Sequence, residues 1–326
     1  MSKKLDTNSL NEEFYQISPK ILESFSKFRI PLDLYLFKEK IASLEPFYKR
    51  DSRLQEEQRK DILERASQGL LFVSRNDHSI YTKHISKQLD LILIDKHLTP
   101  LEIVSILKMA IPEKIAEFYE QPVKPVWEEL QESVIVLLKY LQEDPHRIKG
   151  LIKNLFKQNN DLIKTTYNAG ILGLAITLES KQDIKEKDLK HIALGLFTYD
   201  LGLYRIPKFI REKTANLTPE EQQKIINHPI SGAKLMRKLD IREETLLNCH
   251  LEHHECFDGS GYPRKLKGQD ISLSGKICSL AHFAAELITK NLTPHELLAT
   301  LSKKSQKFAP KFYNTLLNII TNIWLK

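Results

Sequence analysis

The sequence predicts a mostly α-helical protein in which an all-helical C-terminal domain follows a small N-terminal α/β module. Three observations predict this fold class. The chain has 326 residues, which is long enough for two domains with buried cores. Strand-like patterns occur only in its first hundred residues, whereas one helix-start pattern recurs from residue 99 onward. Strands near one end and helices elsewhere are typical of a two-part chain.

The N-terminal module is predicted from two short strands and one helix. In residues 32–37, leucines alternate with other residues after Pro31, which favours a strand. Residues 70–73 (LLFV) predict a second strand, and residues 54–66 (LQEEQRKDILERA) have the composition of an exposed helix. We assign residues 1–98 to this module.

A Thr-Pro-x-Glu pattern marks the start of three predicted helices. The threonine suits the N-cap, the proline suits the first helical position, and the glutamate can close a capping box. The pattern occurs at Thr99-Pro100 with Glu102, at Thr218-Pro219 with Glu221, and at Thr293-Pro294 with Glu296.

Further helices are predicted at residues 127–142, 161–179, 187–200 and 242–255. Prolines 122, 125 and 145 interrupt the helical pattern on either side of the first of these segments. We place a boundary near residue 150, so that residues 99–155 form a connecting helical region and residues 156–326 form the helical domain.

Charge and composition exclude several classes of protein. Lys and Arg outnumber Asp and Glu by 49 to 42, a net charge of +7 that favours anionic ligands without indicating nucleic acid. Apolar runs such as residues 134–138 are too short to span a membrane, and the N-terminus lacks a secretory signal pattern. We therefore expect a cytoplasmic protein whose cysteines, Cys249, Cys256 and Cys278, are reduced.

Residues 253–263, HHECFDGSGYP, hold the densest group of reactive side chains. His253 and His254 are followed by Glu255 and Asp258, and imidazole beside carboxylate suits iron, zinc, nickel or copper. Two glycines and a proline then constrain the loop that follows. Two adjacent histidines alone indicate a metal site and an ordinary structural role about equally.

Three residues outside this block are candidates for the same site. His250 precedes the histidine pair by one helical turn, so one helix face can present several imidazoles. His228 lies in NHPISG, where a proline and a glycine indicate a constrained position. Asp200 ends an apolar segment, where a buried carboxylate needs a partner or a metal. The plainer interpretation of Asp200 is a cap for the loop after its helix.

Together these residues resemble the HD-GYP family of bacterial cyclic-di-GMP phosphodiesterases, a branch of the HD superfamily of metal-dependent phosphohydrolases. The matching segments are YDLGLYRIPKFI, LTPEEQQKIINHPISGAKLM and HHECFDGSGYPRKLKGQDISLSGKI, in the expected order within residues 160–285. The resemblance implies a helical HD fold and a cluster of histidines and aspartates that holds two or three metal ions. It also implies cyclic-di-GMP as the substrate.

One of the metal sites implied by the resemblance is complete in this sequence. Its ligands are Asp200, His228, His253 and His254. These four groups are enough for one divalent ion of iron, manganese or zinc. The neighbouring site is altered, because Tyr199 replaces the histidine of the HD pair and His282 replaces a later aspartate.

Three more positions depart from the family pattern. Tyr167 aligns with a histidine of an early helix, Leu203 replaces a lysine expected to contact substrate phosphate, and Cys256 replaces a common arginine. Because a neutral phenol is a poor ligand for most divalent metals, we expect one metal ion and at most two. A rewired centre that recruits His282, Tyr199 or His250 is the alternative.

The resemblance leaves two functions open. In the first, a degenerate domain binds cyclic-di-GMP or partners such as diguanylate cyclases without efficient hydrolysis. The residues implied in such contacts are Asp258, Gly261, Tyr262 and Pro263 of the loop, with Lys213. In the second, Asp200 is catalytic in an active phosphodiesterase with an altered metal centre. Nucleic-acid binding is less supported, since basic residues are not interleaved with aromatic ones.

Overall fold

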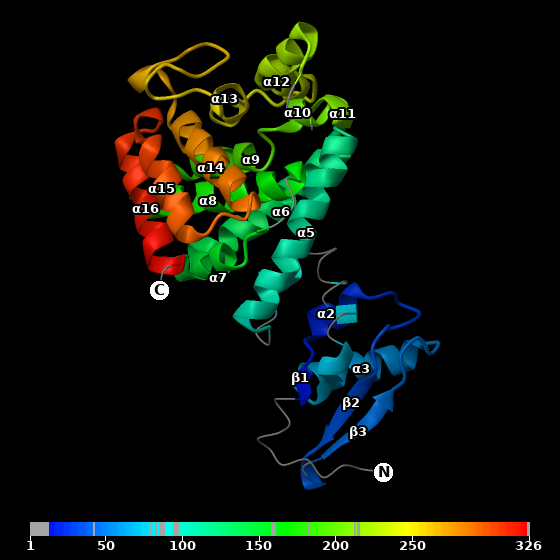
Figure 1. The fold of residues 1–326 in the computed structure, drawn as a ribbon. Helices are drawn as coiled ribbons and strands as arrows, with labels where there is room; N and C mark the ends of the chain where they lie inside the picture. The colour runs from blue at the N-terminus through cyan, green and yellow to red at the C-terminus, as the bar shows by residue number, and fades with distance from the viewer. Residues whose placement is uncertain are drawn as a thin grey trace. The chain divides into compact units, whose positions relative to one another are not determined.

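The computed structural model describes residues 13–41, 43–77, 80–81, 84, 89–93, 98–157, 161–180, 183–211, 213 and 216–324. The chain forms two compact units, Met1–Ala110 and Ile111–Lys326 (Figure 1). Their boundary falls inside helix α5 (Pro100–Glu120), and the predicted divisions at residues 98 and 155 stay predictions. Among the described residues, no helix has both the length and the apolar character that a membrane span requires.

The N-terminal unit contains a four-stranded antiparallel sheet with the strand order β1-β4-β2-β3. Its main elements are β1 (Phe14–Gln16), α2 (Pro19–Ser24), β2 (Leu34–Lys38), β3 (Ser43–Tyr48), α3 (Glu56–Ser67) and β4 (Leu71–Ser74). The two predicted strands are confirmed as β2 and β4, and the predicted helix as α3. Sequence analysis missed β1, which is very short, and β3, whose Pro46 is tolerated because β3 lies at a sheet edge.

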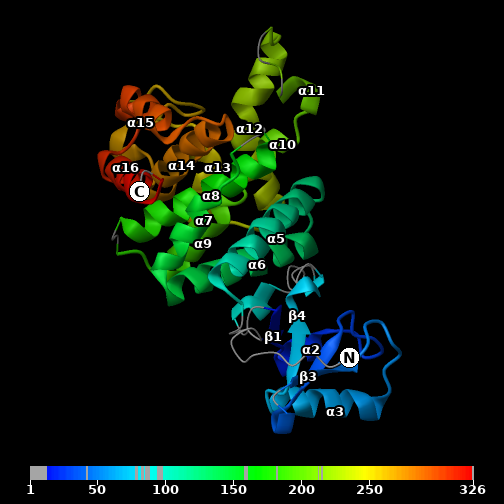
Figure 2. The same ribbon diagram turned by 60° about the horizontal axis from the view of Figure 1, so that its bottom comes forward.

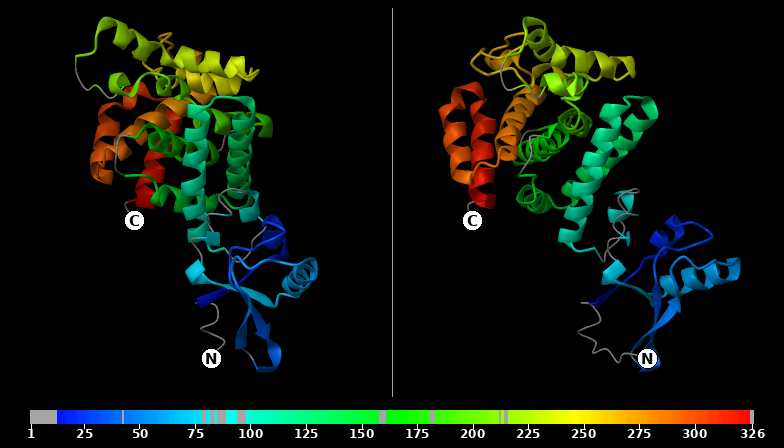
Figure 3. Two further views of the ribbon diagram at one scale, coloured as in Figure 1. Left: turned by 90° about the vertical axis from the view of Figure 1, so that its right-hand side faces the viewer. Right: turned by 45° about the vertical axis from the view of Figure 1, so that its right-hand side comes forward.

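In the helical unit, the other helices surround α8 and α14, which are buried along most of their length. Its helices are the second half of α5, α6 (Lys124–Glu143), α7 (Ile148–Lys153), α8 (Leu162–Glu179), α9 (Glu186–Leu196), α10 (Leu201–Tyr204), α11 (Lys208–Arg211), α12 (Pro219–Lys238), α13 (Glu244–Glu252), α14 (Leu273–Thr289), α15 (Pro294–Lys303) and α16 (Pro310–Trp324). Helix α14 packs against α8, and α13 packs against α9 (Figure 2). Helices α15 and α16 lie side by side (Figure 3). The predicted fold class is therefore confirmed.

All three Thr-Pro-x-Glu patterns start helices at the predicted proline, namely Pro100, Pro219 and Pro294. In α12 the Thr218 hydroxyl accepts from the Glu221 backbone N–H at 3.2 Å, and the Glu221 carboxylate accepts from the Thr218 N–H at 2.9 Å. The other two starts have the same reciprocal pair of hydrogen bonds. These starts could be predicted because each depends on only four neighbouring residues.

Two predicted helices end earlier than expected. Helix α9 stops at Leu196, where the Thr198 hydroxyl donates to the Leu194 carbonyl at 2.8 Å. Helix α13 stops at Glu252, so His253 occupies its C-cap and His254 lies outside it. The predicted single helix face with three imidazoles is therefore wrong, because the chain has left the helix at the histidine pair.

Candidate metal centre

Asp200 is a buried carboxylate without an ordinary hydrogen-bond partner. It lies at the N-cap position of α10 and is 1% exposed. Among the described residues, neither carboxylate oxygen has a hydrogen-bond partner. A buried carboxylate of this kind is costly unless a cation lies nearby.

The orientation of His228 follows from the proline after it. Pro229 lies inside α12 and has no N–H group, so the Ile225 carbonyl lacks its usual helical donor. The His228 Nδ1 donates to that carbonyl at 2.5 Å. A carbonyl can only accept, so Nδ1 carries the proton, and in a neutral ring Nε2 keeps its lone pair.

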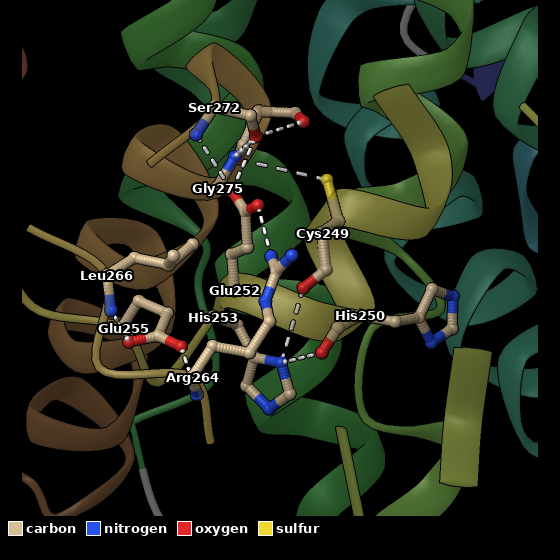
Figure 4. Close-up of polar contacts among 10 residues, drawn as sticks. Cys249, His250, Glu252, His253, Glu255, Arg264, Leu266, Ser272 and Gly275 are labelled. Carbon is tan, nitrogen blue, oxygen red and sulfur yellow. Dashed lines mark hydrogen bonds and ion pairs between the residues drawn. The ribbon is translucent and has the colours of Figure 1, made fainter. Parts of the chain in front are cut away.

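His253 is oriented in the same way by the end of α13. Its Nδ1 donates to the carbonyls of His250 at 2.8 Å and Cys249 at 3.2 Å, as Figure 4 shows. These carbonyls lack helical N–H donors because the helix ends there. Burial lowers the pKa of His253 to about 4, so the ring is neutral near pH 7 and presents the Nε2 lone pair.

The three groups converge on one point. The Nε2 atoms of His228 and His253 are 2.9 Å apart, and they lie 3.3 Å and 3.4 Å from Asp200 Oδ1. Ligands at about 2.0 Å from a tetrahedral ion are about 3.3 Å from one another. His254 completes a cluster in which one nitrogen of each of the three histidines lies within 4.8 Å of the others. These residues fit one divalent metal ion.

The glycine-rich loop positions His254. The His254 ring stacks on Tyr262, with centroids 4.5 Å apart and 18° between the planes. The Tyr262 N–H donates to the His254 carbonyl at 3.1 Å. A side chain at Gly261 would collide with the backbone of His254 and Cys256, so glycine is required there. Pro263 follows Tyr262 through a cis peptide bond.

Glu255 serves the loop rather than the cluster, although the sequence pattern grouped it with the histidines. Its carboxylate accepts from the backbone N–H groups of Arg264 at 2.7 Å and Leu266 at 3.0 Å (Figure 4). The sequence pattern did not indicate Glu252. Its carboxylate accepts from the Ser272 N–H at 2.9 Å and pairs with the Arg264 guanidinium at 2.5 Å. Its position on the apolar face of α13 could have indicated a buried structural carboxylate.

Tyr199 and His282, two of the substituted positions of the altered site, form a hydrogen bond with each other. The Tyr199 hydroxyl is 3.0 Å from His282 Nδ1. Burial, followed by the nearby Asp200 carboxylate, raises the pKa of Tyr199 well above its ordinary value, so the phenol stays protonated. Because the hydroxyl has no other acceptor in the described part of the chain, it donates to Nδ1. That nitrogen then has no lone pair for a metal.

Other candidate residues lie outside the convergent group. His250 Nε2 is 3.1 Å from the Thr198 hydroxyl, and its ring points away from His253 (Figure 4). Tyr167 packs against Phe156 and Phe197. The remaining candidates are Asp258, which accepts from the Ser260 N–H at 2.9 Å, and Lys213, which pairs with Glu221 at 2.7 Å.

Two of the hollows that border the cluster are lined by His282. The larger, of about 770 Å³, is lined by Asp200, His282 and residues of α10 and α11. The smaller, of about 230 Å³, is lined by His253, His254, His282 and the glycine-rich loop. His282 lines both hollows, so a ligand of either one can approach the centre.

Comparison with known proteins finds one matching family and several similar proteins. The HD domain family matches residues 150–311. A probable cyclic di-GMP phosphodiesterase of Vibrio cholerae is 29% identical over 174 residues, or 50% of this chain and 37% of that protein. A cyclic di-GMP phosphodiesterase of Pseudomonas aeruginosa is 29% identical over 42% of this chain and 33% of its own length. The chain thus matches only about a third of each of these relatives.

Two further similarities bear on fold and ligand. A 3'3'-cGAMP-specific phosphodiesterase of Vibrio cholerae is 30% identical over 36% of this chain and 24% of that protein. Among solved structures, an HDG"Y"P protein from Bdellovibrio bacteriovorus has a TM-score of 0.63 at 16% identity. That match covers 95% of this chain and 100% of the other, and it shows a shared fold.

Proposed function

Residues 150–311 belong to the HD domain family and are of the HD-GYP type, and from this premise we propose that the protein binds cyclic-di-GMP at a centre for one metal ion. In this proposal hydrolysis of the nucleotide is weak or absent. The relatives named as cyclic di-GMP phosphodiesterases support the choice of ligand. The large hollow beside Asp200 supports the proposal that the nucleotide binds there.

The observation that carries the proposal is the contrast between two groups of side chains. Asp200, His228 and His253 converge with free lone pairs, whereas Tyr199 and His282 satisfy each other. A divalent ion would polarise a phosphoryl oxygen, and a second adjacent ion is what usually completes hydrolysis. The Tyr199–His282 pair stands where that second ion's ligands are expected.

The alternative is an active phosphodiesterase with an altered centre. His282 favours it, because its ring lies 4.8 Å from that of His254 and 5.5 Å from that of His253, and it lines both hollows. If the hydrogen bond between His282 and Tyr199 were broken, the His282 imidazole would be available to the phosphate that reacts. In this alternative Asp200 and the three clustered histidines are needed for metal-dependent release of linear pGpG or GMP.

The loop is a further part of the proposal. Its tip carries Asp258 and Ser260, which are tied together by a short turn, while Gly261 and Tyr262 are held against His254. A partner such as a diguanylate cyclase could therefore contact the tip without displacing the cluster. The predicted contribution of Lys213 to such contacts stays a prediction.

The test combines metal analysis with an activity assay. Protein purified without oxygen is expected to hold one equivalent of iron, manganese or zinc, to bind cyclic-di-GMP, and to release no pGpG. Asp200→Asn and His253→Ala should lose the metal, whereas His146→Ala, an exposed control, should keep it. Two equivalents of metal together with turnover would overturn the proposal in favour of the active alternative. The same assay with 3'3'-cGAMP examines the second ligand class.

A further inference from the structure

The large hollow lacks a cation at the position where the resemblance places one. Leu203 lies in its lining, three residues after Asp200. A cyclic dinucleotide carries two phosphates, and an apolar side chain cannot stabilise that charge. Binding in this hollow therefore requires basic groups from elsewhere.

Lys208 and Arg211 line the same hollow. They are three residues apart on α11, so both side chains lie on one face of that short helix. Ile206 and Ile210 are buried and anchor the segment. Lys213 also lines the hollow, and its ammonium group is paired with both oxygens of Glu221 at 2.7 Å and 2.8 Å.

The Arg211 guanidinium is held in place before any ligand arrives. It lies 4.8 Å from the centroid of the Tyr204 ring, and its Nη1 donates to the Tyr204 carbonyl at 3.2 Å. Tyr204 is itself held by its hydroxyl bond to Glu120 at 3.3 Å. A guanidinium has five N–H groups, so this one bond leaves several for a phosphate. A planar fork that is already oriented loses little entropy on binding.

We propose that Lys208 and Arg211 hold a phosphate of the cyclic dinucleotide, in place of a lysine at position 203. This inference rests on the proposed function and adds the residues that recognise the anion. Acidic residues, among them Asp161 and Glu286, also line the hollow. An anion is therefore favoured at the basic end of the hollow, on α11, and disfavoured beside those carboxylates.

The experiment measures cyclic-di-GMP binding to the metal-loaded full chain by titration calorimetry. Lys208→Gln and Arg211→Gln should each weaken binding about tenfold, as expected for the loss of a charge-assisted hydrogen bond. Arg211→Lys keeps the positive charge but removes the planar guanidinium, so this variant should lose less affinity than Arg211→Gln. The matched controls are Arg205→Gln and Lys224→Gln, which remove the same charge from the lining of another hollow and should bind as the unaltered protein does.

Adding Leu203→Lys to the Lys208→Gln/Arg211→Gln double variant should recover much of the lost affinity. If the unaltered protein binds the nucleotide and the α11 variants bind equally well, the relocation of phosphate binding is overturned and the proposed function stands. If the unaltered protein binds no cyclic dinucleotide, the proposed function fails, and this inference fails with it.

Discussion

Backbone carbonyl groups fix the tautomers of His228 and His253. Each ring uses Nδ1 as a donor, so two Nε2 lone pairs face each other 2.9 Å apart beside the oxygen of Asp200. Three acceptors so close together repel one another unless a cation lies between them. Burial lowers the pKa of His253 to about 4, so this ring does not supply a proton to that space near neutral pH. The residue-level geometry therefore favours a metal ion.

The role of Pro229 can be tested with one substitution. Pro229→Ala restores an N–H group that competes with His228 Nδ1 for the Ile225 carbonyl. The imidazole should lose its fixed orientation, and metal affinity should fall about tenfold, as is typical when a group that orients a ligand is changed. Competition titration with a metal indicator measures this. Pro112→Ala, inside α5, is the control and should leave affinity unchanged; equal affinity of the Pro229 variant would contradict the argument.

The buried His250 side chain should make the free energy of unfolding depend on pH when a chelator has removed the metal. Burial lowers its pKa from 6.5 to about 3, so between these values only the unfolded chain binds its proton. Its contribution to the free energy of unfolding is complete above pH 6.5. It is lost as the pH falls toward 3, by about 1.4 kcal/mol per pH unit.

Denaturant unfolding at several pH values measures this dependence. His250→Gln should flatten the slope below pH 6.5, whereas exposed His146→Gln should not. Identical slopes for the two variants would show that His250 does not carry the effect.

At the scale of elements, the crossing of α10 and α12 brings Asp200 to His228. The two helices approach at Gly202 and Gly232, where a side chain on Gly202 would collide with the His228 carbonyl. A side chain on Gly232 would press on the His250 ring. The absence of both side chains lets the backbones come close enough for the carboxylate and the imidazole to share one ion.

Gly202→Ala should therefore separate α10 from α12 and weaken metal binding at least tenfold. The reason is geometric, because the colliding atoms are backbone and cannot rotate away. Gly173→Ala is a useful comparison, since its new side chain on α8 would first meet the side chain of Leu196 on α9 rather than a backbone atom. That variant should lose stability while keeping its metal affinity. A Gly202 variant with normal affinity would mean that the crossing does not position the site.

The sequence predicted elements well where the signal was local. The three capped helix starts needed only Thr218, Glu221 and their counterparts, and all were found. The alternation in β2 was visible, but β3 was not, because its Pro46 is acceptable only at an edge that the sheet order defines. The same limit applies to the site. The Tyr199–His282 bond joins residues 83 positions apart, and no local pattern encodes that contact.

At the scale of the whole molecule, all four proposed ligands lie in the unit Ile111–Lys326. The N-terminal unit has a sheet and buried side chains of its own, such as Leu34 and Val73. A metal ion held by these ligands would therefore stabilise the helical unit directly. Binding that is restricted to the folded state raises the free energy of unfolding by about 2.7 kcal/mol when the free metal is at a hundred times its dissociation constant.

Removing the metal with a chelator should accordingly lower the melting temperature of the helical unit by roughly 5–10 °C, given the size of that unit. Hydrogen exchange followed by mass spectrometry separates the units, because peptides from α8 and α13 should lose protection while peptides from β2 and β4 should not. Asp200→Asn should make the helical unit insensitive to the chelator. Equal loss of protection in both units would mean that they unfold together, and no loss in either would mean that the cluster holds no metal that matters for folding.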